Sequence, residues 1–227
     1  MASRIPPFVF SLKSKTDYLR LLVHLVGLFP LAQLVYRGLT GALTFNPIQF
    51  VEQSFGRAAL YLFVLTLAVT PVVTLFGWKA LSRHRRTLGL YTFFYVALHF
   101  LTFSVVDYGM NWGEILRLTV EKPFIIVGTL AGVILLALAV TSFRVWMKRL
   151  GKNWKRLHRA IYLAGGLIIL HYAWALKGSL STLKGDIIQP LLSGALIVVL
   201  LLLRLPPVKR WIISRNNGFI QRIKRQV

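Results

Sequence analysis

Long apolar runs recur along this chain of 227 residues and alternate with short basic segments. Six runs are long enough, or nearly so, to cross about 30 Å of hydrocarbon at about 1.5 Å per helical residue. They cover residues 19–36, 58–78, 88–106, 124–143, 160–176 and 187–203. The strict alternation of polar and apolar residues that marks membrane β-barrels is missing from these runs. The pattern therefore predicts an all-α integral membrane protein built as a bundle of six transmembrane helices.

Composition supports a membrane protein, because 56% of the residues are hydrophobic, 15% are charged and the mean hydropathy is +0.65. We expect an N-terminal cytoplasmic segment (1–18), a six-helix transmembrane domain (19–203) and a basic cytoplasmic tail (204–227). Basic residues precede the first run, and this run has no small-x-small cleavage site. The first helix is therefore expected to remain as an anchor.

Lys and Arg residues lie mostly on one side of the predicted bundle. Of the 28, 22 fall in the N-terminal segment up to Arg20, in the loops 79–87 and 144–159, and in the tail from Arg204 onward. The alternate loops carry five of the six acidic residues. Because short cytoplasmic loops collect Lys and Arg, both termini are predicted to be cytoplasmic.

The net charge of +22 could suggest a nucleic-acid partner. The basic residues, however, lie in loops next to membrane helices, and no nucleic-acid-binding motif surrounds them. Topology and attraction to anionic lipid headgroups explain them more simply, so we expect membrane lipid and no nucleic acid as a partner.

The chain contains no cysteine. This excludes covalent c-type haem, cysteine-ligated iron–sulfur clusters and disulfides. Any haem in this protein must therefore be of the b type, held by histidine.

Three histidines lie inside the apolar runs, and two of them occupy matched positions. His99 follows Thr87, the last residue of a basic loop, by 12 positions, and His171 follows Arg159, the last basic residue before the fifth run, by 12 positions. Both helices run outward, so equal offsets of about 18 Å predict equal depth. An ionisable residue inside a membrane helix indicates a functional site, and paired histidines can hold a haem iron from both sides. The alternative is two neutral core histidines bonded to hydroxyl or carbonyl groups.

The other three histidines fit such a pair less well. His158 precedes His171 by 13 positions, a rotation of about 220° on an ideal helix, so the two should point to different sides. His84 returns to the face of His99 after 15 positions and would suit a second haem shared with His158, but its cationic surroundings favour a solvated loop residue. His24 is isolated, and packing or a hydrogen bond to a neighbouring helix explains it. One haem is expected, and a second stays open.

Three outer-side cations, Arg37, Arg57 and Lys177, are candidates for haem propionates, with interface anchoring as the alternative. Pro30 and Pro71 are expected to kink their helices.

A series of short motifs in fixed order carries a family resemblance over about residues 19–176. The motifs are His24-Leu25-Val26-Gly27-Leu28, Asn46-Pro47, Phe55-Gly56-Arg57, Leu67-Ala68-Val69-Thr70-Pro71, Arg85-Arg86-Thr87-Leu88-Gly89-Leu90, Leu98-His99, Glu121-Lys122-Pro123-Phe124, Ala139-Val140-Thr141-Ser142, Leu150-Gly151-Lys152-Asn153-Trp154, Leu157-His158 and His171-Tyr172-Ala173-Trp174. In these positions the chain resembles the MsrQ (YedZ) family, the haem-binding membrane subunits of bacterial periplasmic methionine sulfoxide reductase systems. That family lies within the ferric-reductase-like transmembrane superfamily.

The resemblance implies a multi-pass protein of the bacterial inner membrane that binds b-type haem, with FMN also associated. It implies that His99 and His171 are axial ligands of the haem iron, and it adds His158 as a third cofactor-binding histidine. Electrons would pass to a periplasmic molybdenum-containing methionine sulfoxide reductase, which supports the repair of oxidised periplasmic proteins. The substrate would be reduced on that partner, so whether this chain is itself an enzyme stays open.

A strand followed by a G-x-G-x-x-G loop and a helix is the fingerprint of a domain that binds NAD(P)H, and the sequence shows no such pattern. The electron donor is therefore expected to be a separate molecule. Membrane quinol or a cytoplasmic flavin reductase would supply the electrons. Two other classes of function stay open: a ferric-reductase or oxidase-like membrane cytochrome, and a non-redox proton channel or transporter that uses the histidines. The latter lacks the intramembrane Asp or Glu chain usual in proton relays.

Overall fold

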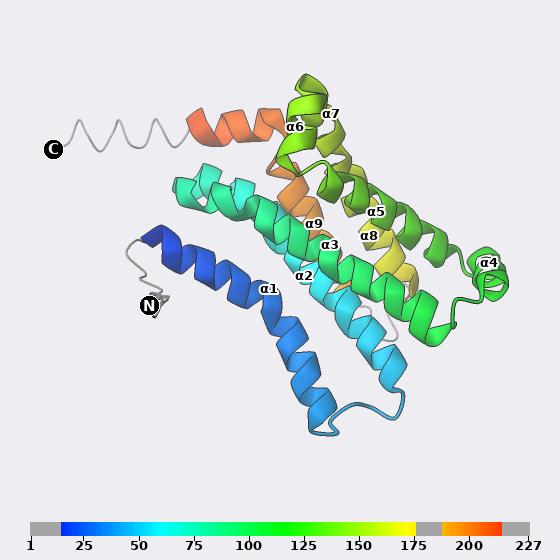
Figure 1. Ribbon diagram of the computed structural model, residues 1–227. Coiled ribbons are helices and arrows are strands. Elements are labelled where there is room, and N and C mark those ends of the chain that lie inside the picture. The colour runs from blue at the N-terminus through cyan, green and yellow to red at the C-terminus, as the bar shows by residue number, and fades with distance from the viewer. Residues whose placement is uncertain (1–14, 176–187, 215–227) are drawn as a thin grey trace, which may run out of the picture.

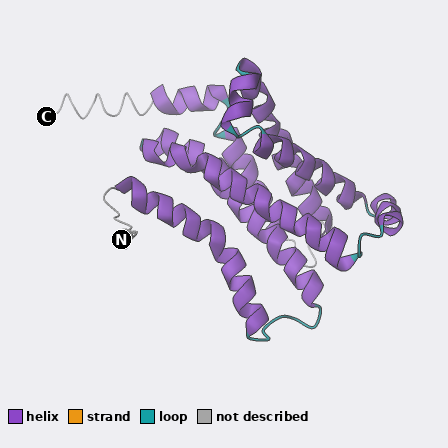
Figure 2. Cartoon of the chain, viewed as in Figure 1, coloured by secondary structure: helices purple, strands orange, loops and turns teal. Residues whose placement is uncertain are grey.

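The computed structural model describes residues 15–175 and 188–214, and every regular element in these two ranges is helical (Figure 2). The elements are α1 (Lys15–Leu39), α2 (Pro47–Phe76), η1 (Lys79–His84), α3 (Arg85–Leu101), η2 (Thr102–Asp107), α4 (Trp112–Glu121), α5 (Pro123–Val140), α6 (Arg144–Leu150), α7 (Lys152–Leu157), η3 (His158–Ala160), α8 (Ile161–Ala175) and α9 (Ile188–Leu202). The all-α prediction is therefore confirmed. Each of the six apolar runs overlaps one long helix, namely α1, α2, α3, α5, α8 or α9.

Four of these helical stretches are long and apolar enough to cross a membrane: Asp17–Leu39, Pro47–Phe76, Lys79–Asp107 and Pro123–Val140. A fifth is reached if α9 and the following helix Pro206–Ser214, bent by 71°, form one span. The chain is thus a multi-pass membrane protein. The predicted count of six is not reached by this measure, because α8 and α9 have 15 residues each. Residues 176 and 187, where two predicted runs end and begin, lie outside the described ranges.

Two antiparallel helix pairs form the body of the protein (Figure 1). One pair is α2 with α3, the other is α5 with α8, and α9 packs beside α2 and α8. One buried cluster joins α1, α2 and α3 and includes Leu62 and Leu88, and a second joins α2, α5, α8 and α9 and includes Leu67 and Ala164. Because α2 contributes to both clusters, it connects the two pairs.

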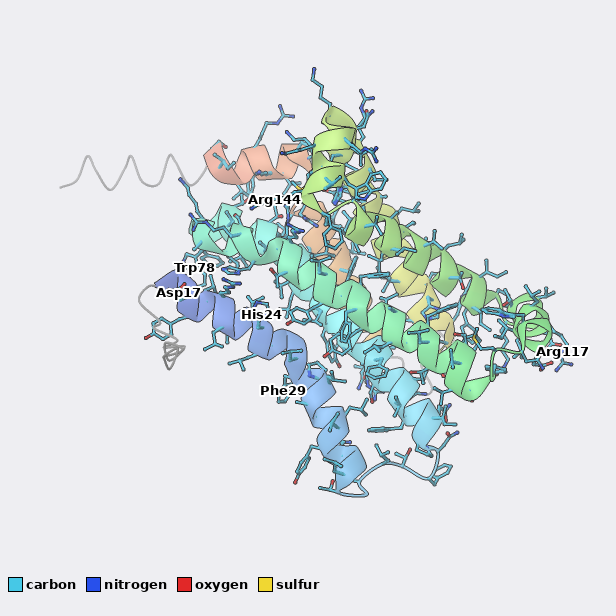
Figure 3. The ribbon with its side chains drawn as sticks, viewed as in Figure 1. Asp17, His24, Phe29, Trp78, Arg117 and Arg144 are labelled. Carbon is cyan, nitrogen blue, oxygen red and sulfur yellow. The ribbon has the colours of Figure 1, made fainter. Side chains whose placement is uncertain are left out.

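Helix α1 bends close to Phe29 (Figure 3), beside Pro30, which has no amide hydrogen to continue the helical ladder. The fully buried Tyr95 of α3 inserts at this bend. Its hydroxyl donates to the carbonyl of Gly27 at 2.8 Å and accepts from the amide of Leu31 at 3.2 Å. In an unbroken helix that amide and that carbonyl would bond to each other. Tyr95 therefore fastens the kink of α1 to α3, and the predicted kink at Pro30 is confirmed.

The ends of α2 follow the usual rules for helix termini. The side chain of Asn46 accepts from the amide of Gln49, and Pro47 occupies the first turn. At the other end Gly77 adopts a left-handed φ of 71° and donates to the carbonyl of Val73. Between these ends α2 continues through Pro71 as one helix.

Several short elements were not expected from the sequence. The third apolar run ends in a π-helical stretch, η2, instead of a regular α-helix. The loop 107–122 contains the helix α4, and the basic loop 144–159 contains α6 and α7. Trp154 of α7 donates its Nε1–H to the carbonyl of Thr141 at 2.9 Å, which ties this loop to the end of α5.

Candidate metal centre

His99 lies near the end of α3 with its imidazole against α2. Its Nδ1 lies 2.9 Å from the carbonyl oxygen of Glu52. One turn further along α2, Gly56 offers the ring an open surface, since a Cβ added there would lie 3.4 Å from Nδ1. The ring is thus held by a backbone carbonyl and lies beside a residue without a side chain.

His171 is held in the same manner on the other helix pair. The residue lies on α8, and its Nδ1 is 2.8 Å from the carbonyl oxygen of Phe124 at the start of α5. One turn later comes Gly128, where an added Cβ would lie 2.5 Å from Nδ1 and 2.6 Å from Cε1. No residue with a side chain can occupy position 128 while the imidazole stays in place.

The carbonyl contacts fix the protonation of both rings. A carbonyl oxygen can only accept a hydrogen bond, so each Nδ1 must carry the proton and donate it. In a neutral imidazole the other nitrogen, Nε2, then presents a bare lone pair. A hydrogen bond from the second ring nitrogen to a carbonyl is how metal-binding histidines are oriented in proteins. Both His99 and His171 are therefore set to ligate through Nε2.

The two rings lie close to each other, in an edge-on arrangement. Their centroids are 6.3 Å apart and their planes cross at 75°. A metal–imidazole bond of about 2 Å on each side, plus about 1.1 Å from each nitrogen to its ring centroid, gives a centroid separation of about 6 Å for two histidines on one metal ion. The observed separation fits a shared metal ion between the rings.

Chemistry of the donor set narrows the kind of metal centre. Among the residues that the structure describes, no group of three or more His, Cys, Asp or Glu side chains converges on one point. Two imidazoles alone would leave a metal ion undercoordinated, so a metal held here would take its other ligands from water or from a cofactor. Haem would supply four nitrogens of its own, and His99 and His171 would be the residues that hold its iron. The residues present fit a haem iron.

His158 is not brought to this pair. It lies in η3, 13 positions before His171, which is about 20 Å along the helical path. Its ring stacks on Trp154 at a centroid distance of 4.0 Å, and its Nδ1 lies 3.2 Å from the carbonyl of the same residue. Burial lowers the pKa of the His158 imidazole below its usual value, which favours the neutral form. His158 thus lies in an environment separate from that of the pair.

The remaining two histidines lie near each other at the end of the bundle where α1 and α3 begin. Figure 3 shows His24 on α1, and its Nδ1 lies 2.9 Å from the hydroxyl of Tyr91 on α3, which is the interhelical hydrogen bond expected for it. The expectation that His84 is solvated was wrong, since only 9% of its surface is exposed. The reason is that η1, which contains His84, packs against α1, and this contact shields the His84 side chain from solvent.

Arg37 and Arg57 line a cavity of about 330 Å³ between α1 and α2, together with Phe50, Ser54 and Tyr61. At about 100° per residue these positions on α2 lie opposite to Glu52 and Gly56. The cavity and the histidine pair are therefore on different faces of α2. Arg57 bonds Ser54 at 3.2 Å, and Arg37 lies over the ring of Phe50 at 5.5 Å. Lys177 lies outside the described residues.

Sequence reasoning missed the two glycines and the two carbonyl acceptors. Gly56 and Gly128 each precede their histidine by 43 positions, and each carbonyl residue precedes its histidine by 47. The equal spacing of single glycines inside apolar helices is the signal that could have revealed the two glycines.

Helices long and apolar enough to cross a membrane, and two histidine rings brought together between them, define the class: multi-pass helical membrane proteins with a buried histidine pair. Residues 55–169 match the family described as ferric reductase like transmembrane component. This range begins in α2, one residue before Gly56, and ends two residues before His171.

Curated relatives carry the name protein-methionine-sulfoxide reductase heme-binding subunit MsrQ. The relative from Herminiimonas arsenicoxydans is 42% identical over 184 residues, which is 81% of this chain and 82% of that protein. Those from Bordetella pertussis and Ralstonia nicotianae are also 42% identical, over 79% and 82% of this chain and 85% and 83% of theirs. The chain therefore belongs to the MsrQ family of ferric-reductase-like transmembrane proteins.

Proposed function

We propose that this chain is a membrane electron-transfer subunit that holds one b-type haem between His99 and His171 and passes electrons to a methionine sulfoxide reductase. The observation that carries the proposal is the close pair of imidazoles, 6.3 Å apart, each with its Nδ1–H donated to a backbone carbonyl. The relatives' names, which combine heme binding with methionine sulfoxide reduction, support it.

The haem, when bound, would supply a one-electron couple of its iron. His99 and His171 would occupy both axial positions, which keeps oxygen and substrates away from the metal. The carbonyls of Glu52 and Phe124 hold the Nδ1 protons in place, so that Nε2 stays available to the metal. These residues thus suit transfer of an electron and not chemistry on a bound substrate.

The proposal extends to the topology. Six spans in residues 19–203, a short N-terminal segment (1–18) and a basic tail (204–227), with both termini in the cytoplasm of a bacterial cell, agree with the one-sided distribution of Lys and Arg. The histidine pair would then lie in the outer half of the inner membrane, near a periplasmic partner.

The proposed donors are membrane quinol or a cytoplasmic flavin reductase, with FMN as a carrier in the second case. The proposed acceptor is a periplasmic molybdenum-containing methionine sulfoxide reductase. The family resemblance supports both assignments, and His158, on the side of the basic loops, is the proposed third cofactor-binding histidine.

The test is the visible spectrum of the detergent-purified protein, oxidised and reduced, with haem and flavin counted per chain. We expect the spectrum of a low-spin b-type haem that reduced flavin or quinol reduces and that the methionine sulfoxide reductase with its substrate reoxidises. A colourless protein would contradict the haem assignment and revive a histidine-based proton channel. Fast reoxidation by ferric chelates or oxygen, with none by the reductase, would instead identify the ferric-reductase or oxidase-like alternative.

A further inference from the structure

Two guanidinium groups meet one hydroxyl where α9 ends. Arg204 follows α9, and its Nη2 donates to the Oγ1 of Thr70 on α2 at 3.2 Å. Arg85, the first residue of α3, donates its Nη1 to the same oxygen at 3.4 Å. Three segments that are far apart in the sequence thus bring two positive charges to one point.

Nothing among the described residues neutralises this pair. The Nη1 atom of Arg204 is shielded from solvent and has no hydrogen-bond partner among those residues. In the same part of the chain, neither Arg204 nor Arg85 forms an ion pair with a carboxylate. A buried guanidinium donor without an acceptor, next to a second cation, is unfavourable unless an anion joins it.

The position of the pair indicates which anion is at hand. After Arg204 the chain turns by 71° into the helix Pro206–Ser214, which leaves the bundle sideways (Figure 1). In this helix Ile212 is buried while Trp211 is 58% exposed. Such a helix, with an aromatic residue and neighbouring cations, is typical of the headgroup region of a membrane. The basic residue Arg144 lies at the same end, whereas Arg117 lies at the opposite end (Figure 3).

We propose that Arg204 and Arg85, positioned by Thr70, bind the phosphate of a membrane phospholipid. The planar N–H fork of arginine matches phosphate oxygens and forms charge-assisted hydrogen bonds with them. Arg85 is exposed and forms the entrance of the site, and Arg204 lies behind it with one donor free.

An exposed apolar surface on α9 is available for contact with the acyl chains of the lipid. Apolar side chains of α9 are exposed along its length below Arg204, including Leu192, Val199 and Leu202. A phosphate that carries acyl chains therefore fits this place better than a soluble phosphate, because its tails cover the apolar face of α9.

The experiment compares thermal unfolding of the full chain in detergent with three additives: phosphatidylglycerol, the diacylglycerol with the same acyl chains, and inorganic phosphate. We expect phosphatidylglycerol to raise the unfolding midpoint of the wild-type protein by about 3 °C or more. Arg204→Gln should lose most of this shift. The matched control is Arg210→Gln, which removes the same charge from the helix that follows the bend and should keep the shift.

Each contrary result overturns a defined part of the proposal. An equal shift in Arg204→Gln and in the wild-type protein would show that Arg204 binds no lipid phosphate. An equal shift with diacylglycerol would show that only the tails are recognised, and an equal shift with inorganic phosphate would assign the site to a soluble anion. If Arg204→Gln does not fold, Thr70→Val carries the test, because it removes the hydroxyl that holds both guanidinium groups and should reduce the shift at least threefold.

Discussion

In the α2–α3 pair and in the α5–α8 pair, one helix supplies a histidine and the other supplies a carbonyl and, one turn later, a glycine. The chemistry is the same, but the available space is not. A methyl group added at Gly56 would lie 3.4 Å from the ring of His99, whereas one added at Gly128 would lie 2.5 Å from the ring of His171. His171 therefore lies directly against the backbone of α5, while His99 has a little room.

The surroundings of the two pairs also differ. The α2–α3 pair is fastened to α1 through Tyr95, and the helix of His99 continues into the π-helical stretch η2. π-Helical turns often occur beside functional sites. In the α5–α8 pair both members are regular α-helices, and α8 packs on α9. His171 is therefore positioned by close packing on the backbone of α5, whereas His99 is positioned by the helices packed around α2 and α3.

The largest effect is expected from removing either imidazole. His99→Ala and His171→Ala should each lose most of the bound haem, because the single histidine that remains would hold the cofactor from one helix pair alone. The measurement is the ratio of haem to protein after purification. His84→Ala is the control and should keep a nearly unchanged spectrum. Wild-type haem content in both core variants would disprove ligation by the pair.

Gly128→Ala should have the next largest effect, since the added methyl group displaces the ring of His171 and breaks its bond to the carbonyl of Phe124. Haem affinity should fall by about tenfold, the usual range for loss of a ligand's support. Titration of the haem-free protein measures it. Gly132→Ala is the matched control on the same helix, where an added Cβ meets only Val96 at 3.7 Å. Equal affinities of the two variants would contradict the close packing of α5 on His171.

Gly56→Ala should cost less than Gly128→Ala, about threefold or less, because a small shift of His99 accommodates the methyl group. The same titration gives the ratio of the two effects. If Gly56→Ala proved the more damaging change, the asymmetry between the pairs would be the reverse of the one described.

Tyr95→Phe should separate stability from haem binding. The change leaves the amide of Leu31 and the carbonyl of Gly27 without their partner and should lower the free energy of unfolding by about 1–2 kcal/mol. Thermal unfolding measures the loss. Tyr91→Phe, which removes only the bond to His24, should cost less. An altered haem spectrum in Tyr95→Phe would show that the framework around α1 reaches the metal centre.

The smallest effect is expected in α4, which joins the two pairs. Glu114 bonds Arg117, and this hydrogen bond lowers the pKa of the Glu114 carboxyl. A carboxyl with a lowered pKa stabilises the fold above its unfolded pKa and loses that contribution as the pH falls through the folded value. Because both side chains are solvated, Glu114→Gln should leave unfolding at pH 7 almost unchanged. A clear loss of stability at pH 7, absent in acid, would show that α4 braces the pairs.

The sequence predicted the helices and the two important histidines because both rest on simple measures. Apolar length locates helices, and equal distances from the last basic residue predicted that His99 and His171 lie at one level, with which the 6.3 Å between their rings agrees. The acceptors of the imidazoles could not be predicted, since a backbone carbonyl leaves no trace in the residue type. The burial of His84 was missed because it depends on how η1 folds under α1, a tertiary contact that local charge does not reveal.

The bond of Tyr95 to α1 also bears on the order of assembly. Helix α1 is synthesised before Tyr95, and the interior of a membrane offers no water to its backbone groups. Until α3 arrives, the amide of Leu31 and the carbonyl of Gly27 have only each other as partners. The present shape of α1 is thus completed only when α3 docks, so the first helix of the chain reaches its final form after the third has been made.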